Sequence, residues 1–214
     1  MAQKYRENYL AIKDKKPNIL LLSNQLDSYD AYETYVKNSF EDISKKLSLQ
    51  YNVVALDDNV LDFINDIHDS HRIIYDKALS YYFLEESKQF GRVSHVMNKM
   101  IERGGKYTDS DYVDQVNKQN RFTIKMNEIM QKHDIDFIIT PSTASVAPKI
   151  GNQEAPDSAL IWTYFGMPAV SIPVFYNNSL GLPYGLQVVA PRYHDLSLLE
   201  FSEVLNVNFG NFNK

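Results

Sequence analysis

Serine hydroxyls are the groups of this chain whose sequence positions best suit nucleophilic chemistry. Ser142 and Ser145 follow an apolar run that ends at Pro141, and Ser171 alternates with apolar residues in a later run. A nucleophilic serine needs a base beside it or a relay to one. The sequence contains no Gly-x-Ser-x-Gly elbow and no Ser-x-x-Lys pair. Because no base can be named for these serines, we expect none of them to be a nucleophile.

Histidines offer a different chemistry. His68 and His71 lie three residues apart in a segment of helical periodicity, with Asp66 and Asp69 beside them. That spacing can place two imidazoles against one metal ion, but zinc usually needs a third ligand. A solvated helix face explains the same residues. We therefore predict no metal site and no cofactor, and keep a metal enzyme as a weaker alternative.

A short aromatic stretch is the third candidate for a site. Residues 159–165 are apolar and include Trp162, the single tryptophan of the chain. Most small-molecule sites combine apolar walls with a few polar groups. Trp162, Thr163 and Tyr164 could line such a pocket, and packing in a core explains them equally well.

The elements expected to position these residues begin with a strand, a helix and a strand. Residues 19–23 form a short apolar run, residues 28–47 repeat apolar side chains at helical spacing, and residues 52–56 form a second apolar run. This order builds a right-handed parallel unit. The loop after the first strand has no glycine, which argues against a phosphate-binding turn there.

Helices are expected to follow. Residues 60–103 keep a helical stripe of apolar side chains until Gly104 and Gly105 end it. A second, long helix is predicted from about residue 108 to 132, because cap-type residues precede its first apolar positions.

Strands return in the last third of the chain. Residues 134–141 form an apolar run, and the loop after such a strand faces the ligand crevice of an open α/β sheet. Residues 142–148 are therefore the first candidate site segment. Residues 166–173 and 181–189 predict two strands joined by a turn. We expect one α/β domain over residues 1–214, with a mixed β-sheet flanked by helices.

Composition narrows the class of protein. The net charge of -5 leaves no excess of Lys and Arg for a phosphate backbone, so we expect no nucleic-acid partner. The absence of cysteine removes disulfides and thiolate zinc sites. No apolar run approaches membrane-spanning length, and the polar start is unlike a signal peptide. We expect a cytoplasmic protein without membrane association.

A family resemblance is carried by motifs in the second half of the chain. They are residues 134–141, 166–173, 181–189 and 195–200, in this order. Together they resemble the carboxyl-terminal part of the amidase signature family, which includes amide hydrolases and the glutamine-processing subunit of aminoacyl-tRNA amidotransferases. Residues 16–22 resemble the strand that follows the family's catalytic core. The resemblance covers essentially the whole chain and implies a partial amidase-signature fold.

The resemblance also implies roles for particular residues. In the family, a nucleophilic serine, a bridging serine and a lysine precede the region that this chain resembles. No residue here inherits those roles, so the chain alone is expected to be inactive. Its implied role is to complete the sheet and to wall the substrate channel. The residues that the resemblance assigns to this wall are Pro141, Ser142, Thr143, Asp157, Trp162, Thr163 and Tyr164. Many family members have asparagine where this chain has Thr163.

Two functions follow as hypotheses. In the first, the chain is the carboxyl-terminal part of a truncated or split amidase that hydrolyses a carboxamide C–N bond, and it binds a small-molecule amide only with the missing amino-terminal half. In the second, it is a non-catalytic binding or interaction module derived from an amidase. Strands that lack their partners leave open sheet edges, which predict a partner chain or a homo-oligomer.

Overall fold

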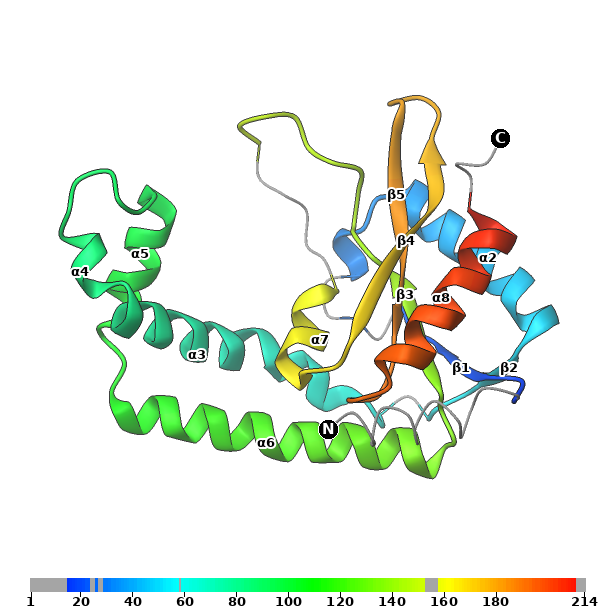
Figure 1. Cartoon of the computed structure of the whole chain (residues 1–214), viewed down its shortest axis with the longest axis horizontal. Helices are drawn as coiled ribbons and strands as arrows, with labels where there is room; N and C mark the ends of the chain where they lie inside the picture. The colour runs from blue at the N-terminus through cyan, green and yellow to red at the C-terminus, as the bar shows by residue number, and fades with distance from the viewer. Residues whose placement is uncertain (1–14, 24–25, 27–28, 58, 153–157, 211–214) are drawn as a thin grey trace. The chain divides into compact units, whose positions relative to one another are not determined.

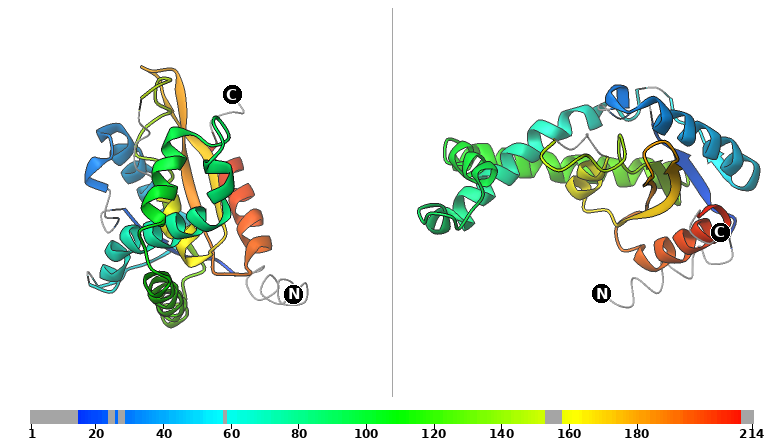
Figure 2. Two further views of the ribbon diagram at one scale, coloured as in Figure 1. Left: turned by 90° about the vertical axis from the view of Figure 1, so that its left-hand side faces the viewer. Right: turned by 90° about the horizontal axis from the view of Figure 1, so that it is seen from above.

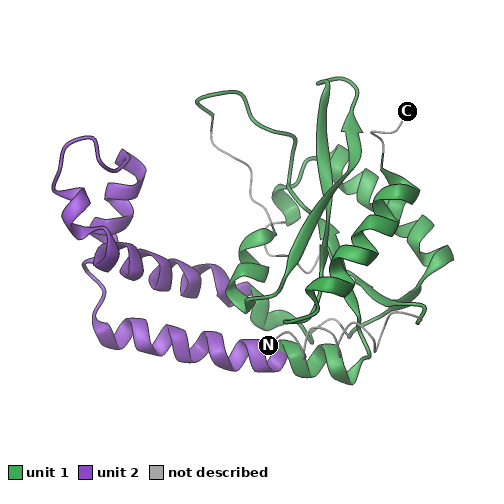
Figure 3. Cartoon of the chain, viewed as in Figure 1, with its two compact units in different colours: residues 1–64, 126–214 green, residues 65–125 purple. Residues whose placement is uncertain are grey.

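The computed structural model describes residues 15–23, 26, 29–57, 59–152 and 158–210 (Figure 1). The chain divides into two compact units, one of residues 1–64 with 126–214 and one of residues 65–125 (Figure 3). The first unit holds a sheet and the second is helical. The assignment of residues 1–214 to a single domain stays a prediction.

Five strands of the described residues form a mixed sheet in the first unit. Their spatial order is β2 (Asn52–Val54), β1 (Asn18–Leu21), β3 (Phe137–Pro141), β5 (Leu182–Val189) and β4 (Ala169–Asn177). β1 runs parallel to β2 and β3, whereas β5 runs antiparallel to β3 and β4. The predicted parallel pair and the predicted pair of joined strands are both confirmed, and so is the α/β class with a mixed sheet.

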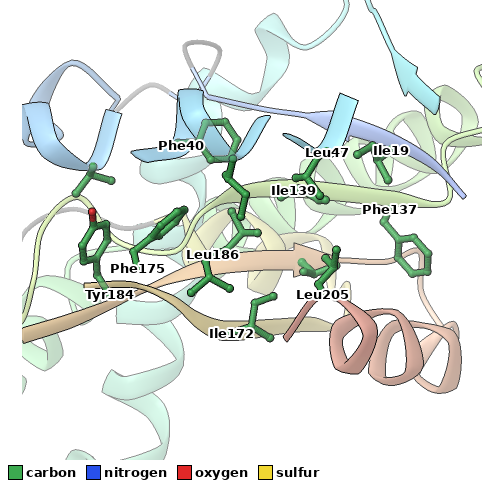
Figure 4. Close-up of a cluster of buried hydrophobic side chains, with 14 of the residues drawn as sticks. Ile19, Phe40, Leu47, Phe137, Ile139, Ile172, Phe175, Tyr184, Leu186 and Leu205 are labelled. Atoms are coloured by element: carbon green, nitrogen blue, oxygen red, sulfur yellow. The ribbon is translucent and has the colours of Figure 1, made fainter. Parts of the chain in front are cut away.

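One face of this sheet carries the hydrophobic core. Alternate residues of a strand point to the same face, and on this face lie Ile19, Phe137, Ile139, Ile172 and Leu186 (Figure 4). Val188 belongs to the same core cluster. Two helices cover it, α2 (Thr34–Gln50) and α8 (Asp195–Phe209), which Figure 2 shows beside the sheet. The rings of Phe137 and Phe201 stack with centroids 4.3 Å apart. This packing fixes the register of the strands, because a shift by one residue would turn the core positions outward.

The opposite face carries polar residues in its middle. Thr140 of β3 and Ser171 of β4 are the cross-strand neighbours of Gln187 on β5. Thr140 and Gln187 are buried there, whereas Ser171 is exposed. A short helix, α7 (Ala159–Phe165), lies over Gln187. This face therefore has a covered part beside α7 and an open part beside β4.

Two of the boundaries that differ from the predictions have a local cause. The helix predicted from residue 28 begins at Thr34 and follows a 3-10 turn, η1 (Tyr29–Ala31), because Glu33 is extended at φ −59° and ψ 142°. The strand predicted to end at residue 173 continues to Asn177 after an irregularity between Ile172 and Phe175. Proline has no N–H for a ladder, which suits Pro173 to an edge strand with such a bulge.

The second unit is built from helices, as the periodicity predicts. After η2 (Asp62–Asp66) at the junction come α3 (Ile67–Tyr82), α4 (Leu84–Ser87) and α5 (His95–Gly104), and then α6 (Asp109–Lys132), which continues into the first unit. Residues 88–94 interrupt the predicted helical stretch. None of the helices in the described residues is long and apolar enough to span a membrane.

A reciprocal cap fixes the predicted start of α6. The Thr108 backbone N–H donates to Asp111 Oδ2 over 2.8 Å, and the Asp111 N–H donates to Thr108 Oγ1 over 3.1 Å. Such a pair satisfies two of the donors that a helix start leaves without partners. The Asp111 carboxylate accepts hydrogen bonds from both the Thr108 N–H and Thr108 Oγ1, and these lower its pKa.

Candidate functional site

A cavity of about 390 Å³ lies in the first unit where β3 ends. It is lined by Ser142, Thr143, Ser145, Val146, Ala147, Pro148, Ser171, Pro183, Tyr184 and Gly185. Most of the segment 142–148 that sequence reasoning places at a crevice thus lines a cavity. The volume falls within the range of about 300–1,000 Å³ that small-molecule sites occupy.

Gly185 lies close to two hydroxyls of this cavity lining. A methyl group added at Gly185 would lie 2.3 Å from Ser171 Oγ and 2.6 Å from Ser142 Oγ. Real side chains do not approach so closely. The Ser142 backbone N–H donates to the Gly185 carbonyl over 3.0 Å, which holds the loop after β3 against β5. Only glycine lets both hydroxyls stand beside this point of β5.

Three other hydroxyls of the cavity lining form hydrogen bonds within the protein. Thr143 Oγ1 donates to the Ser145 carbonyl over 2.6 Å, and Ser145 Oγ donates to the Val146 carbonyl over 2.9 Å. The Tyr184 hydroxyl pairs with Ser39 Oγ over 2.6 Å. Burial raises the pKa of the Tyr184 phenol, and its bond with Ser39 opposes that shift. Within the described residues, the hydroxyls of Ser142 and Ser171 are the ones in this lining without a hydrogen bond.

A buried polar cluster lies beside the cavity, around Gln187. Its Oε1 accepts from Trp162 Nε1 over 2.8 Å and from Ser158 Oγ over 2.8 Å. Ser158 Oγ also lies 2.9 Å from the Pro141 carbonyl and 3.1 Å from Thr140 Oγ1. Because a hydroxyl has a single hydrogen, Ser158 shares it between two acceptors and accepts from Thr140. The cluster fastens α7 to β5 and to the end of β3.

The residues that the resemblance assigns to a channel wall take different places. Ser142 and Thr143 line the cavity, and Pro141 lies next to it. Trp162 and Tyr164 are each 1% exposed and are absent from the lining, while Thr163 is exposed and donates to the Ala159 carbonyl over 3.1 Å. Asp157 lies outside the described residues. The role of these residues in a channel stays a prediction.

Sequence reasoning did not single out three residues of the cavity and of the cluster beside it. Ser158, Gly185 and Gln187 are the three that the structure adds. Gln187 could have been found from the sequence, because it is an amide side chain in the middle of an apolar strand. A buried amide needs hydrogen-bond partners, so such a position indicates a polar cluster.

The residues considered as metal ligands, around His68 and His71, have other roles in the structure. Asp69 is paired with Arg72 over 2.8 Å, and Asp66 is paired with Lys118 over 3.3 Å. No group of three or more His, Asp or Glu side chains suited to a metal ion occurs in the described part of the chain. The His71 ring stacks on Tyr75 with centroids 5.6 Å apart. A packed helix face accounts for these residues.

The comparisons with known proteins decide the family. A model of the amidase family matches residues 24–199. The chain belongs to the amidase family. The resemblance of its motifs to the amidase signature is therefore confirmed.

Curated amidase relatives match parts of the chain. Fatty acid amide hydrolase of Medicago truncatula is 31% identical over 106 residues, which cover 44% of this chain and 17% of that protein. A glutamyl-tRNA(Gln) amidotransferase subunit of Wolbachia pipientis subsp. Culex pipiens (strain wPip) is 27% identical over 150 residues, or 65% of this chain and 30% of that protein. The chain thus matches less than a third of the length of these two relatives.

Solved amidase structures share the fold. A crystal structure of an amidase superposes with a TM-score of 0.76 at 17% identity, covering 91% of this chain and 46% of that one. The structure of 6-aminohexanoate cyclic dimer hydrolase gives a TM-score of 0.68 at 16% identity, covering 96% of this chain and 47% of that one. The chain spans less than half the length of these enzymes. Nearly all of its own length superposes on their fold.

Proposed function

We propose that this chain forms part of the substrate-channel wall of an amide hydrolase that cleaves a carboxamide C–N bond. The observation that carries the proposal is the cavity at the end of β3, with the hydroxyls of Ser142 and Ser171 beside Gly185. Membership of the amidase family supports amide chemistry at this cavity. The nucleophile then has to come from residues outside this sequence.

The chemistry of amide hydrolysis explains why the chain alone is expected to be inactive. Cleavage needs a nucleophile, a base to activate it and donors for the oxyanion. Loss of a single oxyanion donor slows catalysis by about 100- to 1,000-fold. The serines of this chain have no Gly-x-Ser-x-Gly or Ser-x-x-Lys setting. The wall contributes binding and orientation of the substrate, which lower the barrier only when the reacting groups are present.

The cluster around Gln187 would give this wall its rigidity. Trp162 and Ser158 both donate to the same amide oxygen, and Ser158 also reaches the Pro141 carbonyl just before the cavity. Binding residues are held best by neighbours whose own positions are fixed by packing and hydrogen bonds. Under this proposal, Trp162 supports the wall from behind and does not touch the substrate.

A second candidate is a binding or interaction module without catalysis. Its support is the position of β4, which within the described strands lies at an edge of the sheet with Ala169, Ser171 and Pro173 exposed. An open edge of this kind can pair with another polypeptide. In a split or longer amidase, the same edge would pair with the rest of the enzyme. Both candidate functions therefore predict a polypeptide at this edge, and they differ in whether an amide is hydrolysed.

An assay of ammonia release distinguishes them. The chain is tested alone, and then co-expressed with the polypeptide that the same or the adjacent reading frame encodes upstream of it, on a panel of small carboxamides. Under the proposal, that polypeptide carries a Gly/Ser-rich segment and a lysine preceding it, and only the combination hydrolyses an amide. Co-purification without hydrolysis would favour the interaction module. Hydrolysis by the chain alone would show that its serines had been misjudged.

A further inference from the structure

We propose that a second cavity of the first unit binds a small aromatic molecule that carries an uncharged hydroxyl group, of the phenol class. This cavity has a volume of about 210 Å³ and lies where β3 begins, lined by Phe137 and by residues of α8. The candidate site described above lies where β3 ends, and the described linings of the two cavities share no residue. The second site therefore stands apart from amide hydrolysis, and its test needs no catalysis.

Aromatic rings form much of the wall of this second cavity. The ring of Phe201 stacks on that of Phe137 with centroids 4.3 Å apart, and the ring of Tyr51 meets Phe201 edge-on at 5.3 Å. All three residues line the cavity, and Figure 4 shows Phe137 beside α8. Aromatic side chains attract a further ring in stacked or edge-to-face positions. Since an apolar cavity of about 150 Å³ can hold a benzene molecule, the volume here suffices for one substituted ring.

A buried serine gives this aromatic wall a polar point. Ser197, in the first turn of α8, lines the cavity and is 3% exposed. Its hydroxyl has no hydrogen-bond partner among the described residues. A buried polar group without a partner is unfavourable and is rare in folded proteins. Because a phenolic hydroxyl both donates and accepts, it can pair with Ser197 whichever way the serine hydrogen points. Apolar walls with few polar groups are typical of small-molecule sites.

The charges beside this cavity favour a neutral ligand over a carboxylate. Lys15 lines the cavity and is already paired with Asp134 over 3.0 Å and with Asp136 over 3.3 Å. Glu200 is the other charged residue of the described lining. One positive and three negative side chains leave an excess of negative charge, which repels an anion. Burial raises the pKa of the Tyr51 phenol, so this ring is neutral at pH 7.

The test titrates the isotope-labelled full chain with phenol, toluene and benzoate, and follows backbone amide signals by NMR. Phenol is expected to shift the signals of Phe137, Ser197 and Phe201 saturably. The signals of Ser142 and Gly185, in the other cavity, should stay in place. Benzoate is expected to bind at least about tenfold more weakly than phenol, because its charge is repelled. The absence of a saturable shift with phenol, or equal binding of benzoate, would overturn the proposal.

Ser197→Ala tests the polar contact. This variant is expected to weaken phenol binding by about threefold to tenfold, the worth of one hydrogen bond. Toluene binding should stay unchanged, because toluene has no group that pairs with a hydroxyl. Without ligand, the variant should be at least as stable as wild type, since the serine hydroxyl has no partner to lose. An unchanged phenol affinity, an equal loss for toluene or a marked loss of stability would contradict the role of Ser197.

A variant that fills the cavity locates the ligand. Val204 lines the cavity and is 44% exposed, so Val204→Phe adds a ring there at a position outside the core. It is expected to weaken the binding of both phenol and toluene by more than about tenfold, because the ligand loses its space. Val207→Phe, on the same helix at 70% exposure and outside the described lining, is the matched control and keeps wild-type affinity. Equal affinities of the two variants would place the ligand elsewhere and overturn the proposal.

Discussion

Trp162 Nε1 donates a hydrogen bond to Gln187 Oε1 over 2.8 Å, and both side chains are buried. An indole N–H can only donate, so this bond fixes which end of the Gln187 amide faces α7. Ser158 donates to the same oxygen, which ties the start of α7 to β5 as well. Since Trp162 is the only tryptophan of the chain, its fluorescence reports directly on this cluster.

Gln187→Leu tests the strength of the cluster. Leucine is close in size but leaves the Trp162 N–H without its acceptor, whereas the Ser158 hydroxyl keeps the Pro141 carbonyl. We expect a decrease of about 1–3 kcal/mol in the free energy of unfolding, the cost of one unsatisfied buried donor. Denaturant unfolding followed by tryptophan fluorescence measures it. Gln50→Leu, at an exposed position, is the control, and equal stability of the two variants would show that the cluster contributes little.

Gly104→Ala tests the packing of α5 against α3. A methyl group there would lie 1.9 Å from the Asp76 carbonyl oxygen, whereas one at Gly105 meets nothing closer than 3.6 Å. Backbone cannot move aside as a side chain can, so we expect Gly104→Ala to lower the free energy of unfolding by about 2 kcal/mol or more. Gly105→Ala should be neutral or slightly stabilising. Circular dichroism during urea unfolding compares them, and equal losses would contradict the close helix contact.

His71 is expected to make stability depend on pH. Burial lowers the pKa of His71, His68 lowers it further, and Asp76 opposes them. As pH falls below about 6.5, the unfolded chain therefore binds a proton before the folded one, and the free energy of unfolding decreases. His71→Gln should lose less stability than wild type between about pH 7.5 and pH 5.5. The exposed His95→Gln variant should follow wild type, and a His71→Gln curve that did the same would exclude this titration.

Local signals predicted most of the elements. The apolar period and the Thr108 and Asp111 cap placed α6 almost to the residue, because a helix start is determined by neighbours in sequence. The parallel pair of β1 and β2 followed from the strand, helix and strand order. The helix α2 begins later than predicted, because the apolar periodicity does not indicate that Glu33 is extended after a 3-10 turn.

The site was less accessible to sequence reasoning because its contacts join distant residues. Gln187 lies 25 residues from Trp162 and 29 from Ser158 along the chain, and no local pattern links them. Sequence left Trp162 open between pocket and core, and the structure places it inside the cluster at 1% exposure. Sequence reasoning expected no nucleophile at Ser171, and within the described residues this serine lies exposed on an edge strand of the sheet.

The most direct test of the proposed function is to identify the residue that attacks the amide. The chain, co-expressed with its upstream polypeptide, is treated with a serine-directed fluorophosphonate, and the intact mass of each polypeptide is measured with the remaining amide hydrolysis. We expect the upstream polypeptide to gain one adduct as activity is lost, while this chain keeps its mass. An adduct on Ser142, Ser145 or Ser171 that accompanied the loss of activity would contradict the conclusion that this chain shapes the site without supplying the nucleophile.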